Sequence, residues 1–405
     1  MKQPIIIIVV ALLLLCGKKS YAQFSLSGEF RPRTELSHGA KSLASDNQDA
    51  SLFTSQRTRL NAMYKSEKVI TMLVLQDMRT WGSQAQLVGN EDFAISVHQA
   101  WAEVFLAPEF SLKAGRQELA YDDQRIFGNV GWAQQARSHD VAVFKYQKDI
   151  SLHVGIAHHE NSNITNNVFD GKDAYKDMQF AWFNKKWDDA GLSLLFLNNG
   201  VPVNEVDGQK VNYSQTFGGH GKFTIGEFKF SANAYLQTGE DVAGNDISAH
   251  NLLLEATCKH GFTWGYERLS GTGYDDTKNK SFNPLYGTNH KFNGFMDYFY
   301  VGNHLNNVGL NNIYAKYNYS KDELSLYAHV HYFSSAAKIT SGADRYLGTE
   351  VDLGAGWKIS PEANFSGGFS FMIAGDSMEL LKGGDKSAGN YWAYLMLTVT
   401  PTFIK

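Results

Sequence analysis

The stretch Phe24-Ser-Leu-Ser-Gly-Glu-Phe-Arg-Pro-Arg-Thr-Glu35 alternates strictly between two kinds of side chain. Its odd positions are polar or charged, and its even positions are apolar or small. A period of two residues is that of a β-strand whose two faces meet different surroundings. The polar face carries arginines and glutamates, which suits a wet surface where charges pair between neighbouring strands. Repetition of this pattern along the chain then decides the fold.

The N-terminus has the three parts of a secretory signal peptide. A basic start precedes an apolar run at residues 5–15, and the segment ends in the small-x-small sequence Ser20-Tyr-Ala22. The apolar run is shorter than the roughly 20 residues that a membrane-spanning helix needs. We therefore predict that residues 1–22 are removed and that residues 23–405 form one mature domain.

Loss of residues 1–22 has two consequences for the composition of the mature chain. It leaves a single cysteine, Cys258, so no internal disulfide can form. It also removes three lysines and no acid, which takes the formal charge from -4 to -7. A lipoprotein anchored through Cys16 is the alternative, but Leu15 occupies the position where lipid attachment requires a small side chain.

Strand-like segments recur to the end of the chain, separated alternately by short and long polar links. We predict about 18 strands, near residues 24–35, 52–65, 69–81, 94–106, 110–119, 139–146, 150–160, 177–187, 190–198, 212–225, 226–239, 246–260, 261–270, 309–319, 323–333, 346–359, 361–375 and 389–403. An exported, cysteine-poor, aromatic-rich chain with an even number of two-faced strands is typical of an all-β transmembrane antiparallel up-and-down β-barrel of the bacterial outer membrane.

In such a barrel the short links are periplasmic turns and the long links are outer loops. The turns are predicted at Lys148-Asp149, Asp188-Asp189, Ile225-Gly226 and Ser360-Pro361. The loops are predicted at 38–50, 82–93, 120–138, 160–176, 199–211, 240–245, 271–308, 334–345 and 376–388. A closed barrel has no free edge to tolerate the missing N–H of Pro32, so we expect this proline near a strand end or a bulge.

Arginine is concentrated early in the chain. Eight of the ten arginines lie at or before residue 137: Arg31, Arg33, Arg57, Arg59, Arg79, Arg116, Arg125 and Arg137. The alternation turns the first five into the lumen, where neighbouring strands about 4.8 Å apart would stack them into a ladder. Acids placed to brace them are Glu29, Glu35, Asp77, Glu103 and Glu118. One interpretation is an anion-selecting pore wall; the other is charge pairing that only fills and stiffens the lumen.

Several motifs together resemble the alginate-export family of outer-membrane channels. They are Arg31-Pro-Arg-Thr-Glu35, Gln56-Arg-Thr-Arg-Leu60, Leu75-Gln-Asp-Met-Arg-Thr-Trp-Gly82, Gln99-Ala-Trp-Ala-Glu103, Gly115-Arg-Gln-Glu-Leu119, Asp122-Asp-Gln-Arg-Ile-Phe-Gly128, Trp132-Ala-Gln-Gln-Ala-Arg-Ser-His-Asp140 and the segment Pro284 to Phe299. The resemblance implies an 18-stranded monomeric barrel with an arginine-rich constriction for an anionic polyuronate. The eight arginines would form that constriction, with Asp77, Glu103 and Glu118 as partners. The family name does not fix the substrate, which is expected to be an acidic polysaccharide or a smaller anionic or sugar solute.

Two long links are candidates for contact with such a solute. Segment 120–138 is predicted to fold into or over the pore. Its members Tyr121, Asp122, Asp123 and Trp132 offer aromatic faces and carboxylates of the kind that bind sugars, or they pack the interior of the loop. Segment 282–300 is predicted to be an outer lid with a helical turn at residues 295–298, or a packed loop.

Other site types have weaker support in the sequence. His329 and His331 share one strand face, but no third ligand is identifiable, so we predict no metal and no cofactor. His158 and His159 point to opposite faces. No serine, histidine and acid cluster at strand ends, so no catalytic site is predicted.

Two alternatives to a channel are kept: a plugged barrel that serves as an adhesin or structural anchor, and a barrel hydrolase. The expected partners are outer-membrane lipid, an anionic polysaccharide or small anionic solute, and the machinery that inserts barrels. Nucleic acid is not expected as a partner, and the barrel is expected to be a monomer.

Overall fold

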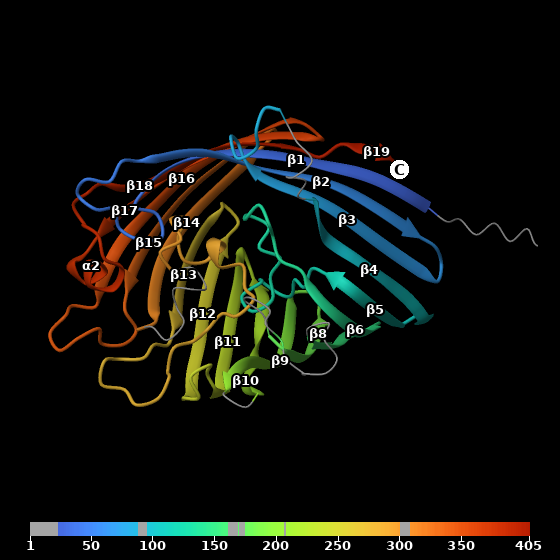
Figure 1. Cartoon of the computed structure of the whole chain (residues 1–405), viewed down its shortest axis with the longest axis horizontal. Coiled ribbons are helices and arrows are strands. Elements are labelled where there is room, and N and C mark those ends of the chain that lie inside the picture. Colours follow the sequence, from blue (N-terminus) through green and yellow to red (C-terminus); the bar gives the residue numbers. More distant parts are fainter. Residues whose placement is uncertain (1–22, 88–94, 161–168, 170–174, 206–207, 300–307) are drawn as a thin grey trace, which may run out of the picture.

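The strands of the computed structural model close into one barrel, with the longer connections gathered at one end (Figure 1). The structure describes residues 23–87, 95–160, 169, 175–205, 208–299 and 308–405. The expected signal peptide, residues 1–22, lies outside the described residues. None of the helices in the described part of the chain is long and apolar enough to cross a membrane.

Nineteen strand segments of the described chain form a single antiparallel sheet. They are β1 (Gln23–His38), β2 (Ser51–Lys65), β3 (Val69–Thr80), β4 (Ile95–Ala107), β5 (Phe110–Gln117), β6 (His139–Gln147), β7 (Ile150–His158), β8 (Asp177–Lys186), β9 (Ala190–Glu205), β10 (Gly208–Ile225), β11 (Phe228–Glu240), β12 (Asp246–Cys258), β13 (Phe262–Leu269), β14 (Leu310–Lys321), β15 (Leu324–Ser334), β16 (Tyr346–Ser360), β17 (Ala363–Ala374), β18 (Asn390–Val399) and β19 (Thr402–Ile404). β19 continues β18 after Pro401, and both pair with β1, so the barrel closes with the 18 predicted strands. A 3₁₀ helix, η1 (Asn289–Lys291), and an α-helix, α2 (Asp376–Lys382), lie in the connections.

The two faces of each strand have opposite character. In β12, Leu252 and Leu254 are 46% and 62% exposed, whereas Asn251 and Leu253, which alternate with them, are almost fully buried. Along the ring the exposed positions form an apolar outer band, and the buried positions are largely polar. An apolar exterior around a polar interior, in a sheet closed on itself by backbone hydrogen bonds between neighbouring strands, is the arrangement of a transmembrane barrel of the outer membrane.

The predicted turns are confirmed, but one predicted loop is wrong. Backbone pairing closes tight turns after β6, β8, β10 and β16, the positions expected for the periplasmic side. The expected outer loop at 199–211, in contrast, is mostly strand, since β9 runs to Glu205 and β10 starts at Gly208. Valines at 201, 203 and 211 give this stretch the β-branched character of a strand despite its polar residues.

Pro32 lies neither at a strand end nor at a bulge of β1, contrary to expectation. It sits mid-strand and faces Gln56 across an unbroken β1–β2 register. The effect of the missing N–H is seen on the other side of β1, toward β18. There the register pairs stop at Phe30↔Val399 and resume at Arg33↔Met396. The closing seam of the barrel therefore accommodates the proline.

Two connections fold back inside the ring of strands, and together they are termed the crossbar: residues 118–138 after β5 and residues 282–299 of the connection after β13 (Figure 1). They join through a parallel bridge between Phe127 and Tyr286. The Thr288 N–H also donates to Gln124 O at 2.9 Å. The helical turn expected at residues 295–298 is wrong, because the helical turn of this segment is η1. The prediction that segment 120–138 folds into the pore is confirmed.

Candidate functional site

Arg31 fastens the crossbar to the barrel wall. Its Nη1 donates to Gly131 O at 2.8 Å, and its Nη2 donates to Trp132 O at 3.1 Å and Ala133 O at 3.2 Å. Its Nε donates to the Gln134 side chain at 3.2 Å. One planar guanidinium thus donates to three successive carbonyls of a loop that lies inside the lumen.

Arg33 and Arg57 hold the same stretch from either side of Arg31. Arg33 donates to Trp132 O at 2.7 Å and lies 4.2 Å from the centroid of the Trp132 ring. Arg57 donates to Ala133 O at 3.2 Å and pairs with Glu29 at 2.6 Å. Three arginines of the predicted ladder therefore face the lumen as expected, but their donors are engaged by loop backbone.

Arg59 completes the lumenal set and contacts the wall alone. Its Nε donates to Gln76 Oε1 at 2.7 Å, and Glu29 Oε2 lies 3.8 Å from its Nη1. Glu35 pairs with Arg33 at 2.8 Å. The two glutamates of β1 therefore brace the arginines in the manner expected.

Asp77 and Arg79 are not lumenal, which corrects the prediction for both. The register pairs lumenal Arg57 with Met78 of β3, so the residues on either side of Met78 point outward, on the face shared by Leu75. There Arg79 pairs with Asp77 at 2.7 Å. A shift of one residue in register reverses every side chain of a strand, and the sequence of β3 alone does not fix that register.

Arg116 also lies on the outward face, with Asp140 as its partner at 3.0 Å. Adjacent residues of a strand point to opposite faces, and the next residue of β5, Gln117, is almost fully buried on the lumenal face. Glu103 does face the lumen, but its cation is Lys145 at 3.0 Å, not an arginine. The predicted ladder is thus shorter than expected and confined to β1 and β2.

Arg125 and Arg137 belong to the crossbar itself and connect its two segments. Arg125 is 1% exposed and pairs with Glu267 of β13 at 2.7 Å. It also donates to Asn289 Oδ1 at 2.7 Å. Arg137 donates to Gly287 O at 3.2 Å. These two arginines join the two crossbar segments to each other, and Arg125 also fastens them to β13.

Glu118 marks the point where the chain leaves β5 and enters the crossbar. It accepts hydrogen bonds from His98 at 2.8 Å and from Asn129 at 3.2 Å. Burial raises the pKa of this carboxyl, but these two hydrogen bonds and the nearby charge of Arg59 outweigh it, so the pKa lies below the ordinary glutamate value. Glu118 therefore stays charged and holds the start of the segment.

Tyr121 and Asp122 attach the crossbar to the wall opposite the arginines. The Tyr121 hydroxyl bonds His153 at 3.0 Å, and its ring packs 4.9 Å from that of Trp182. Trp182 Nε1 donates to Asp122 at 3.1 Å. Burial raises the pKa of Asp122. Asp123 accepts from Asn233 at 2.6 Å.

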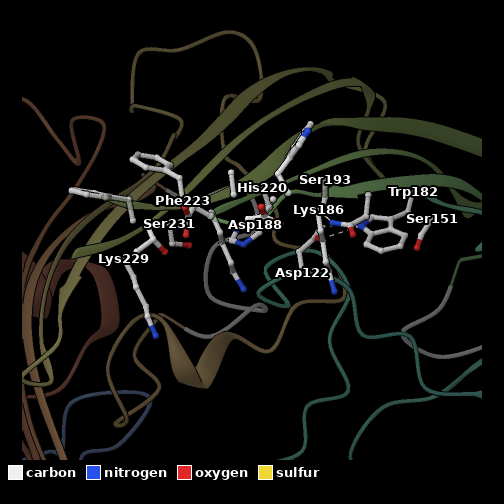
Figure 2. Close-up of a pocket in the computed structure, with 18 of the residues that line it drawn as sticks. Asp122, Ser151, Trp182, Lys186, Asp188, Ser193, His220, Phe223, Lys229 and Ser231 are labelled. Atoms are coloured by element: carbon white, nitrogen blue, oxygen red, sulfur yellow. Dashed lines mark hydrogen bonds between the residues drawn. The ribbon is translucent and has the colours of Figure 1, made fainter. Parts of the chain in front are cut away.

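The crossbar leaves a pocket on each side of it. The periplasmic pocket, about 810 Å³, is bounded by Asp122 of the crossbar and by Asp188 of the short β8–β9 turn (Figure 2). The outer pocket, about 710 Å³, is lined by Arg33 and Trp132 and by Trp392 of β18. Of the four predicted loop contacts, Asp122 thus reaches the periplasmic pocket and Trp132 the outer one.

Lysines supply the lumenal charge that sequence analysis did not single out. Lys186, Lys222 and Lys229 line the periplasmic pocket, and Figure 2 shows Lys186 and Lys229 extending from the wall toward the inner segments. Lys113 lies 3.7 Å from the Trp101 ring centroid. Within the described residues, none of these four has a carboxylate oxygen within 4.0 Å. The alternation of each strand already places its lysine on the lumenal face, and this could have identified the four residues. They did not stand out because lysines are spread uniformly along the chain.

A third group lies in the wall behind the crossbar. His329 and His331 of β15 face the lumen, and the register places Asp352 of β16 opposite His329. One donor atom from each of the three residues lies within 4.8 Å of the others. The histidine pair therefore has the third potential ligand that the sequence did not reveal.

Comparisons with known proteins bear on the fold. No protein-family model matches the chain, and no curated protein matches it. Among solved structures the chain is similar to a group of Pseudomonas aeruginosa proteins that includes the following three. OccK11 (OpdR) has a TM-score of 0.61 and 14% identity over 95% of this chain and 96% of that one. OccK5 (OpdH) has a TM-score of 0.61 and 12% identity over 94% of this chain and 98% of that one. The outer membrane protein OpdK has a TM-score of 0.56 and 12% identity over 93% of this chain and 99% of that one.

At identities this low, the structural similarity establishes a shared fold and nothing finer. The matches confirm the closed antiparallel barrel predicted from the strand pattern, and the chain has the fold of an outer-membrane β-barrel. The alginate-export resemblance is not shown by these matches.

Proposed function

We propose that the chain is a porin-like channel for passive, anion-favouring passage of solutes across the outer membrane. The closed barrel and its polar interior support a channel. The crossbar supports selectivity, because it narrows the lumen between two pockets and is held in place from both walls. In this proposal the arginines of β1 and β2 shape the constriction by positioning the crossbar.

The observation that carries the anion preference is the set of lysines without acid partners. A lysine paired with a carboxylate presents little net field to a passing ion, whereas Lys186, Lys222 and Lys229 border open pocket volume. Charged side chains lining a constriction select ions of opposite sign. Asp188 and Asp189 at the mouth reduce the net charge there, so we expect anion preference rather than exclusion of cations.

The pocket also suggests the class of solute. Trp182 provides an aromatic face beside polar His153 and Asn184, which suits a sugar ring, and the lysines suit a carboxylate on that ring. We therefore propose an anionic sugar as the solute. The resemblance to the alginate-export family extends this proposal to an acidic polysaccharide such as alginate. We further propose that the barrel works as a monomer surrounded by outer-membrane lipid.

A plugged barrel that acts as an adhesin or anchor is the second candidate. It is favoured by the many contacts of the crossbar, especially the buried pair of Arg125 and Glu267. The two functions differ in conductance, since a barrel closed by its crossbar passes no steady current.

Reversal potentials of the purified barrel in planar bilayers, under a salt gradient, test both. We expect steady conductance with anion preference in the parent protein. Substituting Lys186, Lys222 and Lys229 together by glutamine should shift the reversal potential toward cation preference. A matched control replaces Lys278, Lys280 and Lys386 of the outer loops and should leave it unchanged. Absence of conductance would favour the plugged barrel, and equal shifts in both triple variants would refute the lysine assignment.

A further inference from the structure

We propose that His329, His331 and Asp352 form a binding site for a divalent transition-metal ion in the barrel wall beneath the crossbar. The three residues come from neighbouring strands, β15 and β16, and all face the lumen. Asp352 is fully buried, His331 is 2% exposed and His329 is 8% exposed. The site is separate from the pockets and lysines of the proposed channel.

Hydrogen bonding fixes the protonation of His331. Asn312 donates through Nδ2 to Phe292 O at 3.0 Å, so its Oδ1 is the atom that faces the imidazole. An amide oxygen can only accept, and therefore His331 Nδ1 donates to it, at 3.0 Å. The neutral ring then has a bare lone pair on Nε2. That nitrogen lies 3.9 Å from Asp352 Oδ2.

His329 is held in a comparable state. Its Nε2 bonds Asn318 Oδ1 at 3.2 Å, which again makes the imidazole the donor when the amide oxygen faces it. The other ring nitrogen, Nδ1, is buried without a hydrogen-bond partner. Each histidine thus donates a hydrogen bond from one ring nitrogen to an asparagine side chain and leaves the other nitrogen free. Proteins orient metal-binding imidazoles by this arrangement.

The carboxylates beside the two histidines are incompletely hydrogen-bonded. Within the described residues, neither oxygen of Asp352 has a hydrogen bond of ordinary geometry, although the Ser370 hydroxyl, the Phe295 N–H and the Glu350 carboxyl lie close enough to interact with it. Glu350, two residues earlier on the same face, likewise has one buried oxygen without a partner. Buried acceptors of this kind are costly unless a cation or proton lies between them. A 3.9 Å separation also fits two ligands on one ion, since metal–ligand distances are about 2.0–2.2 Å.

The donor set indicates the class of ion. Two imidazoles and one carboxylate suit Zn²⁺, Co²⁺, Fe²⁺ or Ni²⁺, whereas Ca²⁺ and Mg²⁺ prefer sites made of oxygen alone. Lys316 lies opposite His329 in the β14–β15 register, with Nζ 4.4 Å from the Tyr314 ring centroid. Its ammonium opposes cation binding, so it should weaken the affinity.

The crossbar seals this site from the lumen. The Met296 N–H donates to Glu350 Oε1 at 2.8 Å, and the Phe295 ring lies 5.5 Å from that of His329. An ion in the wall would therefore lie directly behind residues 292–297 and stabilise the surface on which they rest.

Metal binding to the refolded full-length barrel tests the proposal without any measurement of transport. The protein is stripped with chelator and titrated with Co²⁺, whose visible absorption reports nitrogen ligands, and bound metal is counted by elemental analysis after dialysis. We expect about one Co²⁺ or Zn²⁺ per chain. His331→Gln and Asp352→Asn should each weaken binding at least about 100-fold, and Asn312→Ala should weaken it about 10–100-fold, as outer-shell losses do.

Controls separate binding from folding. His153→Gln changes another lumenal histidine and should bind as the parent does, and Lys316→Met should bind more tightly. Circular dichroism and resistance to heating in detergent confirm the barrel in each variant, and His329→Gln replaces any variant that does not fold. Equal binding by the parent and His331→Gln, or displacement of Co²⁺ by equimolar Ca²⁺, would overturn the proposal.

Discussion

The guanidinium of Arg33 lies over the indole of Trp132 with its Cζ 4.2 Å from the ring centroid, and its Nη1 donates to the carbonyl of the same residue at 2.7 Å. One wall arginine thus holds a single loop residue through both its side chain and its backbone. Together with Arg31 and Arg57 this contact makes the β1–β2 wall the attachment surface of the crossbar. The position of the constriction therefore depends on arginines that a solute need not touch.

Removal of Arg31 should loosen the constriction. Hydrogen bonds to a charged group contribute about 1.5–3 kcal/mol each, and Arg31→Ala leaves the carbonyls of residues 131–133 without this donor. We expect higher single-channel conductance and more open-state noise. Arg59→Ala is the matched control, since it removes the same charge from the adjacent strand without removing a hydrogen bond to residues 131–133. Indistinguishable traces from the two variants would contradict the anchoring role.

The pair of Arg125 and Glu267 should behave as a buried ion pair. Removing one partner of such a pair costs about 3–5 kcal/mol, whereas replacing both with apolar residues is often neutral. Glu267→Gln should therefore expose the crossbar to trypsin at Arg137, and the double variant Arg125→Met, Glu267→Leu should restore much of the protection. Cleavage rates at Arg137 give the comparison. Greater cleavage in the double variant than in the single one would argue against an isolated pair.

Gly294 should be intolerant of a side chain. Its φ is +80°, and a Cβ would come within 2.5 Å of the Glu350 carboxylate. Gly294→Ala should therefore raise conductance noise and trypsin cleavage of the crossbar. Gly383→Ala separates backbone strain from collision, because φ is +68° there and a Cβ would meet nothing within 4 Å. If both variants change the crossbar equally, steric contact with Glu350 is not the cause.

Lys382 at the end of α2 should titrate unusually early. Burial lowers its pKa from 10.5 to about 8. The folded state therefore holds fewer protons than the unfolded state between these values, so the docking of α2 strengthens as the pH rises through that range. Acylation by a small reagent across pH 6–11, quantified by mass spectrometry, should give an apparent pKa of about 8. Lys386, whose pKa is raised by its hydrogen bond to Asp376, is the internal control and should react only at higher pH.

The strands could be predicted because alternation is a property of each strand by itself. Phe24 to Glu35 shows two faces without reference to any neighbour, and so do most later segments. The facing of Asp77 and Arg79 could not be predicted in the same way. Their orientation depends on which residue of β3 pairs with Arg57, and that register depends on the turn and on packing across both strands.

The role of the arginines was predicted only in part. Their lumenal position on β1 and β2 follows from alternation, but their partners are backbone carbonyls about 100 residues away. Every residue carries a carbonyl, so no residue type at positions 131–133 marks it as the acceptor. The lysines and the third ligand beside His329 were missed for a related reason, since both depend on how several strands are aligned around the ring.

The interruption at Pro32 has a consequence for how the ring comes apart. β1 and β18 belong to opposite ends of the chain. Their ladder lacks register pairs beside Pro32, and the register with β19 shifts between Leu26 and Ser27. The neighbouring β1–β2 ladder is continuous from Gln23 to Ser37. The β1–β18 seam that closes the barrel is therefore less completely paired than the β1–β2 ladder next to it. Under mechanical load or in denaturant we expect β1 and β18 to separate first, while the remaining strand pairs stay hydrogen-bonded as one sheet. Backbone amide hydrogen exchange within β1 should accordingly be fastest from Phe30 to Arg33.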